Sequence, residues 1–302
     1  MKQHFHTIRF ILGDQLTPSL SSLKDADPNR DLIVMAEPHV EATYVPHHRQ
    51  KIVMILSAMR HFAEELRENG FHVAYFDYQN HPTKSFTDAL KAALSEHNIK
   101  EVIVTEPGEW RVKHEIDKWS EDLDISVDVR ADDRFFAPLS AFADFAKDRK
   151  ELRMEYFYRG LRRDTGILME PDGKPVGGQW NFDHDNRKSL PDDVTPPSPK
   201  TFAPDKITQG LLDRVCDDFP DALGDIASFG WPVTRKDALA ALDHFIKHRL
   251  AQFGDYQDAM TVKSATLYHS LISPCLNTGL LLPDEVCRAA EKAYLEGKAP
   301  LN

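Results

Sequence analysis

Residues 1–135 alternate short apolar runs with amphipathic segments. Runs of strand length, rich in β-branched and apolar residues, occur at residues 7–12, 32–36, 72–76 and 101–105. Between residues 48 and 69 the apolar side chains recur at helical spacing, at Ile52, Ile55, Leu56, Met59, Ala63 and Leu66. Further helices are expected over about residues 85–96 and 112–121. Because strands and helices alternate at these lengths, the pattern predicts an α/β fold with a doubly wound parallel sheet.

The pattern changes after this part. Residues 141–163 are predicted to be helical, and residues 165–205 form a long connection rich in proline and glycine. Beyond it only helical or turn-rich patterns follow, over about residues 207–219, 235–252, 268–279 and 283–296. We therefore expect an α/β domain at 1–135, a helical and Pro/Gly-rich interdomain segment at 136–206, and the beginning of an all-α domain at 207–302.

Composition narrows the class of protein. The 302 residues carry a net charge of −11, which argues against a surface that binds nucleic acid throughout but allows a local basic groove. No run approaches the roughly 18 apolar residues of a membrane helix. The N-terminus has no apolar signal-peptide segment, and three widely spaced cysteines suit a reducing compartment. These features predict a cytoplasmic protein without membrane contact, and we expect a monomer.

Polar residues follow the first two predicted strands. Gly13, Asp14 and Gln15 end the first strand, and Glu37 follows the second. In a doubly wound sheet such positions face the ligand crevice, although ordinary turn chemistry explains a Gly-Asp pair equally well. The next helix begins with basic residues, including Lys51, which oppose the helix dipole. Either an anionic ligand compensates them or they form an exposed basic face.

A basic segment lies in the predicted helical region. Residues 147–163 contain seven Lys and Arg against three Asp and Glu, with Tyr156, Phe157 and Tyr158 among them. Such a mixture suits nucleic acid, because cations meet phosphates and aromatic rings stack on bases. Core packing of the aromatic run is the alternative. The glycine-rich stretch 177–183 is expected to pin the long connection to a domain surface.

The sequence predicts no metal site. Cys216, Cys275 and Cys287 do not form a C-x-x-C motif, and three thiols cannot complete a four-ligand cluster alone. Each is expected to be a small buried side chain. The chain also lacks the G-x-G-x-x-G, Walker, G-x-S-x-G and H-E-x-x-H motifs, so no catalytic residue is assigned.

Six stretches in order resemble the bacterial iron–sulfur photolyase and cryptochrome family, the prokaryotic (6-4) photolyases or deoxyribodipyrimidine photolyase-related proteins. They are ILGDQL at 11–16, SAMRHF at 57–62, TEPGEWR at 105–111, MEYFYR at 154–159, GGQWNFD at 177–183 and HSLISP at 269–274. The resemblance implies a doubly wound antenna domain followed by the beginning of an all-α FAD-binding domain.

The resemblance also implies cofactors. A 6,7-dimethyl-8-ribityllumazine antenna would be lined by Gly13, Asp14, Gln15, Glu37, Tyr44 and Lys51. FAD would contact Tyr256, His269, Ser270, Leu271 and Ser273. A [4Fe-4S] cluster is expected in the full-length family, with its ligands beyond this chain, because the family's helical domain continues past the position that matches residue 302. We therefore expect the chain to be shorter than the activity requires.

The implied activity is light-driven repair of (6-4) photoproducts in UV-damaged DNA. Reduced FAD would pass an electron to the lesion, and Arg159, Arg163 and Arg187 would contact the DNA. Two alternatives stay open. One is a cryptochrome-type blue-light photoreceptor, and the other is an antenna- or nucleotide-binding module without catalysis.

Overall fold

The computed structural model describes residues 4–302, and the chain divides into two compact units. The first unit reaches to Asp132 and takes in Thr201–Arg235 and Asn277–Leu280. The second unit consists of Asp133–Lys200, Lys236–Leu276 and Leu281–Asn302. These two units are defined by how the chain packs. The predicted division into an antenna domain, an interdomain segment and a FAD-binding domain concerns function and stays a prediction.

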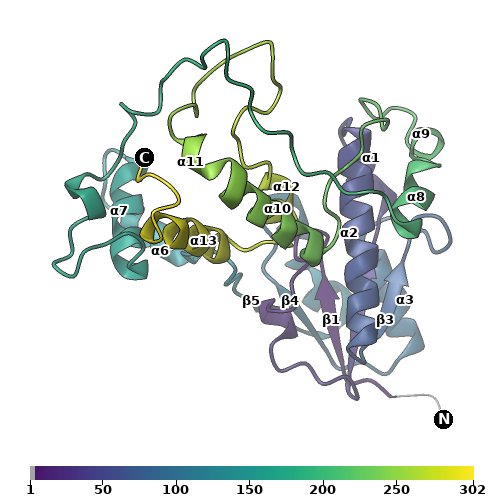
Figure 1. Cartoon of the computed structure of the whole chain (residues 1–302). Coiled ribbons are helices and arrows are strands. Elements are labelled where there is room, and N and C mark those ends of the chain that lie inside the picture. Colours follow the sequence, from purple (N-terminus) through teal and green to yellow (C-terminus); the bar gives the residue numbers. More distant parts are fainter. Residues whose placement is uncertain (1–3) are drawn as a thin grey trace. The chain divides into compact units, whose positions relative to one another are not determined.

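A five-stranded parallel sheet forms the centre of the first unit (Figure 1). Its strands stand in the order β3-β2-β1-β4-β5, and their bounds are β1 Thr7–Ile11, β2 Asp31–Ala36, β3 His72–Phe76, β4 Glu101–Thr105 and β5 Ser126–Arg130. This order confirms the predicted doubly wound α/β fold. The edge strand β5 was not predicted from the sequence, because charged residues interrupt its short apolar alternation.

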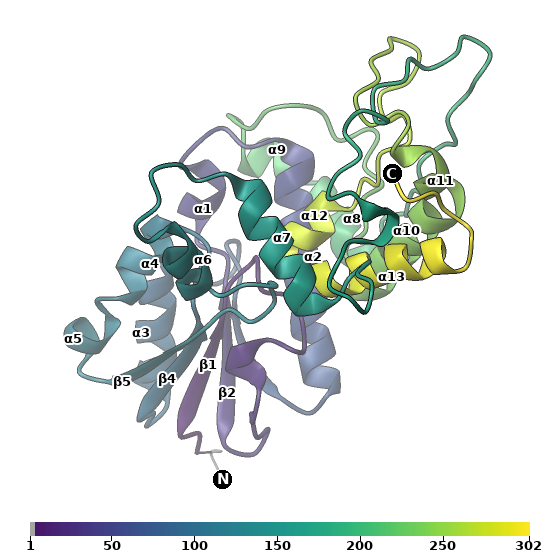
Figure 2. The ribbon, with the colours of Figure 1, turned by 90° about the vertical axis from the view of Figure 1, so that its left-hand side faces the viewer.

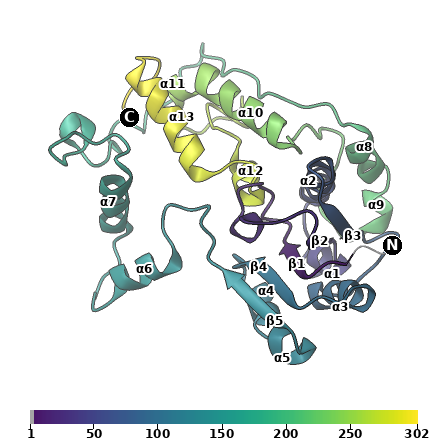
Figure 3. The ribbon, with the colours of Figure 1, turned by 90° about the horizontal axis from the view of Figure 1, so that it is seen from below.

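Helices cover both faces of the sheet (Figure 3). The helices α3 (Phe86–Glu96), α4 (Trp110–Ile116) and α5 (Trp119–Leu123) share one core with the strands. The long helix α2 (Arg49–Glu68) lies on the other side, and its ten buried residues reach most of the way round the helix. The predicted helices over 48–69 and 85–96 are thus confirmed.

The single helix predicted over residues 112–121 is wrong, because the chain forms α4 and α5 with a break between them. The break lets Trp119 enter the core, where it is fully buried and its ring centroid lies 5.0 Å from that of Phe10. Its Nε1 donates a hydrogen bond to Thr87 Oγ1 at 2.9 Å. Burial of a large aromatic side chain outweighs the modest gain from one continuous helix.

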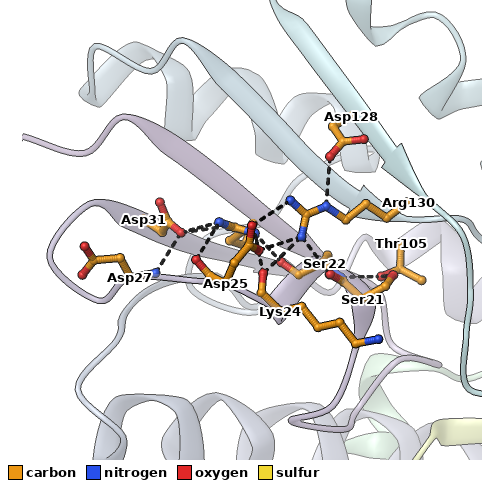
Figure 4. A network of polar contacts seen from close by, with 10 residues as sticks. Ser21, Ser22, Lys24, Asp25, Asp27, Asp31, Thr105, Asp128 and Arg130 are labelled. Carbon is orange, nitrogen blue, oxygen red and sulfur yellow. Dashed lines mark hydrogen bonds and ion pairs between the residues drawn. The ribbon is translucent and has the colours of Figure 1, made fainter.

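An arginine network holds the connection between β1 and β2, which contains the 3₁₀ turn η1 (Ser21–Leu23) (Figure 4). Arg9 is 5% exposed and donates to Asp31 and to the carbonyl of Ser22. Arg130 on β5 donates to Asp25 at 2.8 Å and to Asp128 at 2.9 Å. The network thus ties this connection to β1, β2 and β5.

The helices α8 (Lys206–Leu212) and α9 (Val215–Asp218) pack on α2 within the first unit. Ser57 and Thr208 hydroxyls lie 2.7 Å apart in this buried contact. Asp205 caps α8 by accepting from the Thr208 amide at 2.9 Å, and it also meets His61 at 2.5 Å. The helix predicted over 207–219 is therefore two short helices.

The second unit is helical. The remaining helices of the chain have the bounds α6 Leu139–Ala146, α7 Met154–Thr165, η2 Val176–Gly178, α10 Arg235–His248, α11 Leu250–Phe253, α12 Ser273–Thr278 and α13 Pro283–Leu295. The first residue of α10 and the last two residues of α12 belong to the first unit. The continuous helix predicted over 141–163 is wrong, because residues 147–153 are not helical and Asp148 has a φ of 58°. Six of those seven residues are charged, so no apolar stripe exists to hold a helix there. Of the helices within residues 4–302, none combines the length and apolar character needed to cross a membrane.

The helix α1 (His39–Thr43) connects β2 to α2 and was not predicted. Its five residues are too few to show a helical hydrophobic period. Figure 2 shows α1 beside α4, at the same end of the sheet. This end is where the carboxyl termini of the strands meet.

Candidate ligand-binding site

A cavity of about 360 Å³ lies at the carboxyl edge of the sheet, wholly within the first unit. Three strand ends contribute to its lining through Leu12, Gly13, Asp14, Ala36, Glu37, Pro38, Pro107, Gly108 and Glu109. The first and last of these strands, β1 and β4, are the neighbours at which the strand order reverses. A doubly wound sheet binds its ligand at that reversal, so fold and cavity agree on the position.

Apolar side chains from α2 form much of the cavity wall. Ile52, Ile55, Leu56 and Met59 line it, together with Phe86 and Val112 from the helices on the other face. Gly13 lies so close to α2 that a Cβ at this position would stand 2.9 Å from Met59 Sδ. An added methyl group here would therefore displace the end of the Met59 side chain, which lines the cavity.

Glu37 lines the cavity with its carboxylate already engaged. Arg60 donates to both of its oxygens at 2.8 Å, Tyr75 Oη donates at 2.5 Å, and the Tyr78 amide donates at 3.3 Å. A carboxylate has about four acceptor positions, so these donors occupy them. Burial and the neighbouring Glu37 carboxylate raise the pKa of Tyr75 well above its ordinary value. In this arrangement Glu37 shapes the wall, and we expect a ligand to meet its methylene groups.

Asp14 and Gln15 behave differently from each other. Asp14 lines the cavity, whereas Gln15 is fully buried and is not among the described lining residues. Gln15 Nε2 donates to the carbonyl of Thr105 at 3.2 Å, and its Oε1 accepts from the Leu12 amide at 3.4 Å. Gln15 therefore ties the end of β1 to the end of β4 and supports the cavity from behind.

Basic and aromatic residues stand at the α1 side of the cavity. Tyr44 and Lys51 both line it, and so does His47. Lys51 Nζ donates to His47 Nδ1 at 3.2 Å. Burial, followed by the charge of Lys51, lowers the pKa of His47, so the imidazole is neutral at pH 7 and accepts this bond. Lys51 thus brings a positive charge to a mainly apolar cavity.

The residues expected to contact FAD lie in one stretch of the second unit. Tyr256 stacks on Tyr268 with ring centroids 5.5 Å apart, and the His269 carbonyl accepts from Arg249 at 2.9 Å. Leu271 has a φ of 59°, a left-handed conformation that is unusual for leucine. Ser270 precedes it, and Ser273 begins α12. Their role toward FAD stays a prediction.

The basic segment is organised around one aromatic ring. The guanidinium carbons of Arg159, Arg162 and Arg163 lie 5.3, 5.6 and 4.8 Å from the Trp180 ring centroid. Arg159 is also paired with Glu155 at 2.6 Å. Arg187 is exposed and lies 3.9 Å from Asp258, at the limit of an ion pair. Trp180 therefore pins the glycine-rich stretch onto α7, within the second unit.

The cysteines do not meet. Cys275 is buried and Cys287 is half-buried, but Cys216 is exposed, so the expectation that each cysteine is buried is wrong for Cys216. Burial raises the pKa of Cys275 to about 12, so its thiol is protonated at neutral pH. Among residues 4–302, no group of three or more His, Cys, Asp or Glu side chains is arranged to hold a metal ion.

Some residues that line the cavity were not predicted from the sequence. Glu41 on α1 and Glu109 before α4 both line the cavity, and neither was named as a candidate. Glu109 belongs to the TEPGEWR stretch that follows β4, so the strand-end rule applied to β4 would have found it. Glu41 carries no such signal, because α1 itself was not predicted.

Fold and cavity define a doubly wound α/β protein with a cavity at the carboxyl edge of its sheet. The model of the deoxyribodipyrimidine photo-lyase-related protein family matches residues 9–231, and the chain belongs to this family. The family resemblance stated from the sequence is thereby confirmed.

Individual relatives show how much of the chain is matched. This chain is 48% identical over 293 residues to a (6-4) photolyase of Agrobacterium fabrum strain C58. The aligned residues make up 97% of this chain and 58% of the photolyase. An uncharacterised protein, R852, of Acanthamoeba polyphaga mimivirus is 20% identical over 148 residues, which is 48% of this chain and 73% of that protein. The chain therefore spans somewhat more than half the length of the photolyase that it matches.

A solved structure confirms the fold. The crystal structure of a bacterial class III photolyase from Agrobacterium tumefaciens matches with a TM-score of 0.54 and 14% sequence identity. The match covers 100% of this chain and 56% of that chain.

Proposed function

We propose that the first unit binds a 6,7-dimethyl-8-ribityllumazine antenna in the cavity at the carboxyl edge of the sheet. One observation carries the proposal: five of the six residues expected at an antenna, Gly13, Asp14, Glu37, Tyr44 and Lys51, line this one cavity. Its volume and its mainly apolar wall with a few polar groups are typical of sites for small organic ligands.

The cavity suits the chemistry of this ligand. A flat heterocycle has two apolar faces, which the α2 wall can cover, and polar edges that need donors and acceptors. Lys51 supplies a donor and Asp14 a carboxylate at the rim. A ribityl chain carries hydroxyl groups, which suit the polar side of the cavity near Glu109.

For the whole protein we propose light-driven, FAD-dependent repair of (6-4) photoproducts in DNA. The 48% identity to a (6-4) photolyase supports this proposal. Bound lumazine would supply light absorption, and bound reduced FAD would supply an electron to the lesion. The chain's own contribution is placement: the cavity holds the antenna, Ser270 and Ser273 would hold FAD, and Arg159, Arg163 and Arg187 would meet DNA phosphates.

A titration with purified lumazine tests the antenna proposal. Wild-type chain is expected to bind one equivalent, followed by the change in ligand fluorescence. Gly13→Ala places a methyl group 2.9 Å from Met59 Sδ and 3.6 Å from Ile55 Cγ2, so we expect about tenfold weaker binding. Gly210→Ala is the matched control, since its Cβ would meet no described atom within 4 Å and α8 does not line the cavity. Equal affinity of the two variants would contradict the assignment.

A second candidate is an antenna-binding module without catalysis. All the lining residues of the cavity belong to the first unit, which favours binding that is independent of the flavin site. This candidate predicts that the purified chain retains lumazine but no flavin, whereas the photolyase proposal predicts that the full-length protein retains both.

A further inference from the structure

The segment between β2 and α2 covers one side of the cavity and has little internal support. It contributes Glu37, Pro38, Glu41, Ala42, Tyr44 and His47 to the lining. None of the five described residues of α1 is buried, and no described side chain caps its first turn. A helix this short is not stable by itself, so contacts to other elements must hold the segment in place.

One end of the segment is fixed to α9. The His39 ring stacks on the Phe219 ring with centroids 4.9 Å apart, and His39 Nε2 lies 3.4 Å from the carbonyl oxygen of Asp218. Glu37 at the start is fixed by Arg60. These contacts anchor the part of the segment that follows β2.

The far end, next to α2, is fixed by a backbone hydrogen bond from the Leu223 amide to the His47 carbonyl at 2.8 Å. The middle of the segment is held by Arg111. Arg111 on α4 donates two hydrogen bonds to Glu41, at 2.8 and 2.5 Å, and its Nε donates to Glu109 at 3.0 Å. Its guanidinium carbon also lies 4.8 Å from the Tyr44 ring centroid. Arg111 itself is not one of the described residues that line the cavity. It therefore ties two walls together from outside: the α1 segment and the connection that follows β4.

The charges favour this closed arrangement. Glu41 and Glu109 are two carboxylates on facing parts of the lining, and without a cation between them they would repel each other. The hydrogen bonds to Glu41, then the charges of Glu41 and Glu109, raise the pKa of Arg111, so the guanidinium stays charged at any working pH. The Arg–carboxylate fork adds a fixed direction to the attraction.

We propose that Arg111 is a latch that closes the α1 segment over the cavity and sets the rate at which the bound antenna leaves. The proposal rests on the antenna function of the same cavity. Arg111 belongs to the TEPGEWR stretch, and the latch gives that stretch a role beyond the cavity wall. Arg111 acts as a positioning residue, through Glu41 and Tyr44.

Hydrogen exchange of the ligand-free chain tests the latch without the antenna. The Tyr44 amide donates to the Val40 carbonyl and the Glu41 amide to the Pro38 carbonyl, so their exchange reports opening of the segment. In Arg111→Met these amides are expected to exchange about tenfold faster than in wild type, which corresponds to about 1.4 kcal/mol. Unchanged exchange would overturn the latch whether or not lumazine binds.

Ligand kinetics supply the second test. Stopped-flow mixing is expected to show lumazine release from Arg111→Met about tenfold faster than from wild type, with association no slower. A gate gives this pattern because opening admits the ligand as well as releasing it. A merely damaged site would instead slow association. Glu41→Gln should behave like Arg111→Met, and the double variant should add little, since both remove the same contact. Arg111→Lys should be intermediate, because it keeps the charge but loses the fork.

Arg130→Met is the matched control. Arg130 also bridges two carboxylates, Asp25 and Asp128, but in the network away from the cavity (Figure 4). Its loss should leave lumazine release within twofold of wild type. Equal acceleration by both variants would overturn the latch and indicate general destabilisation. Failure of the wild-type chain to bind lumazine would refute the antenna function, while the exchange experiment would still decide the latch.

Discussion

The contact between Glu37 and Arg60 offers a direct test of how the cavity wall is held. The Glu37 side chain is 1% exposed and that of Arg60 is 21% exposed, so the pair is shielded from water. Arg60→Met removes both guanidinium hydrogen bonds and leaves a buried carboxylate with Tyr75 and the Tyr78 amide as its remaining donors. Methionine keeps much of the side-chain volume, so the change isolates the loss of charge and hydrogen bonding.

The expected cost follows from the burial. Removing one partner of a buried ion pair costs about 3–5 kcal/mol, and the two remaining donors place this case near 3 kcal/mol. Glu37→Gln/Arg60→Met removes the uncompensated charge as well, and we expect it to regain about half of that loss. The two changes should therefore couple strongly.

Urea unfolding followed by circular dichroism measures these free energies. We expect Arg60→Met to lower the free energy of unfolding by about 3 kcal/mol and the double variant to be more stable than Arg60→Met. A loss below about 1 kcal/mol would show that Arg60 does not compensate a buried charge, and so would a double variant whose loss equals the sum of the two single losses.

Three further predictions concern other parts of the chain. Burial alone would raise the pKa of Asp205, but hydrogen bonds from Thr208 and His61 outweigh it and hold the pKa below its ordinary value of 3.8. Asp205→Ala should therefore lower the free energy of unfolding by about 1 kcal/mol at pH 7. Unfolding curves should show this difference disappearing as the pH falls below 3.8. At pH 8 a thiol reagent should modify the exposed Cys216 rapidly and the buried Cys275 only on unfolding, so equal rates would contradict the structure. In the full-length protein Arg163→Ala should weaken DNA binding and reduce the slope of log affinity against log salt by about 0.9. An unchanged slope would show that Arg163 only packs on Trp180 and does not contact DNA phosphate.

The parallel sheet was predictable because each buried strand is a local apolar run. The strands at residues 72–76 and 101–105 have the predicted bounds, and α2 differs from its predicted range by one residue at each end. Over residues 112–121, where one continuous helix was predicted wrongly, a tertiary contact determines the structure. The burial of Trp119 between α3 and the sheet interrupts a helical pattern that looks continuous in the sequence.

The candidate site was predictable only in part, for a related reason. Gly13, Asp14 and Glu37 follow strands, and the strand-end rule places them at a ligand crevice. The contact of Glu41 with Arg111 joins residues 70 positions apart through an unpredicted helix. No local pattern reports such a pair, so the latch could be found only from the three-dimensional structure.

The proposed antenna function requires the cavity at the carboxyl edge of the sheet to hold a lumazine. Gel filtration of the chain after incubation with 6,7-dimethyl-8-ribityllumazine, followed by absorption spectroscopy and mass analysis of the released compound, measures this binding. We expect one lumazine per wild-type chain and much less retained by Gly13→Ala. Folded wild-type chain that elutes without lumazine would contradict the antenna function.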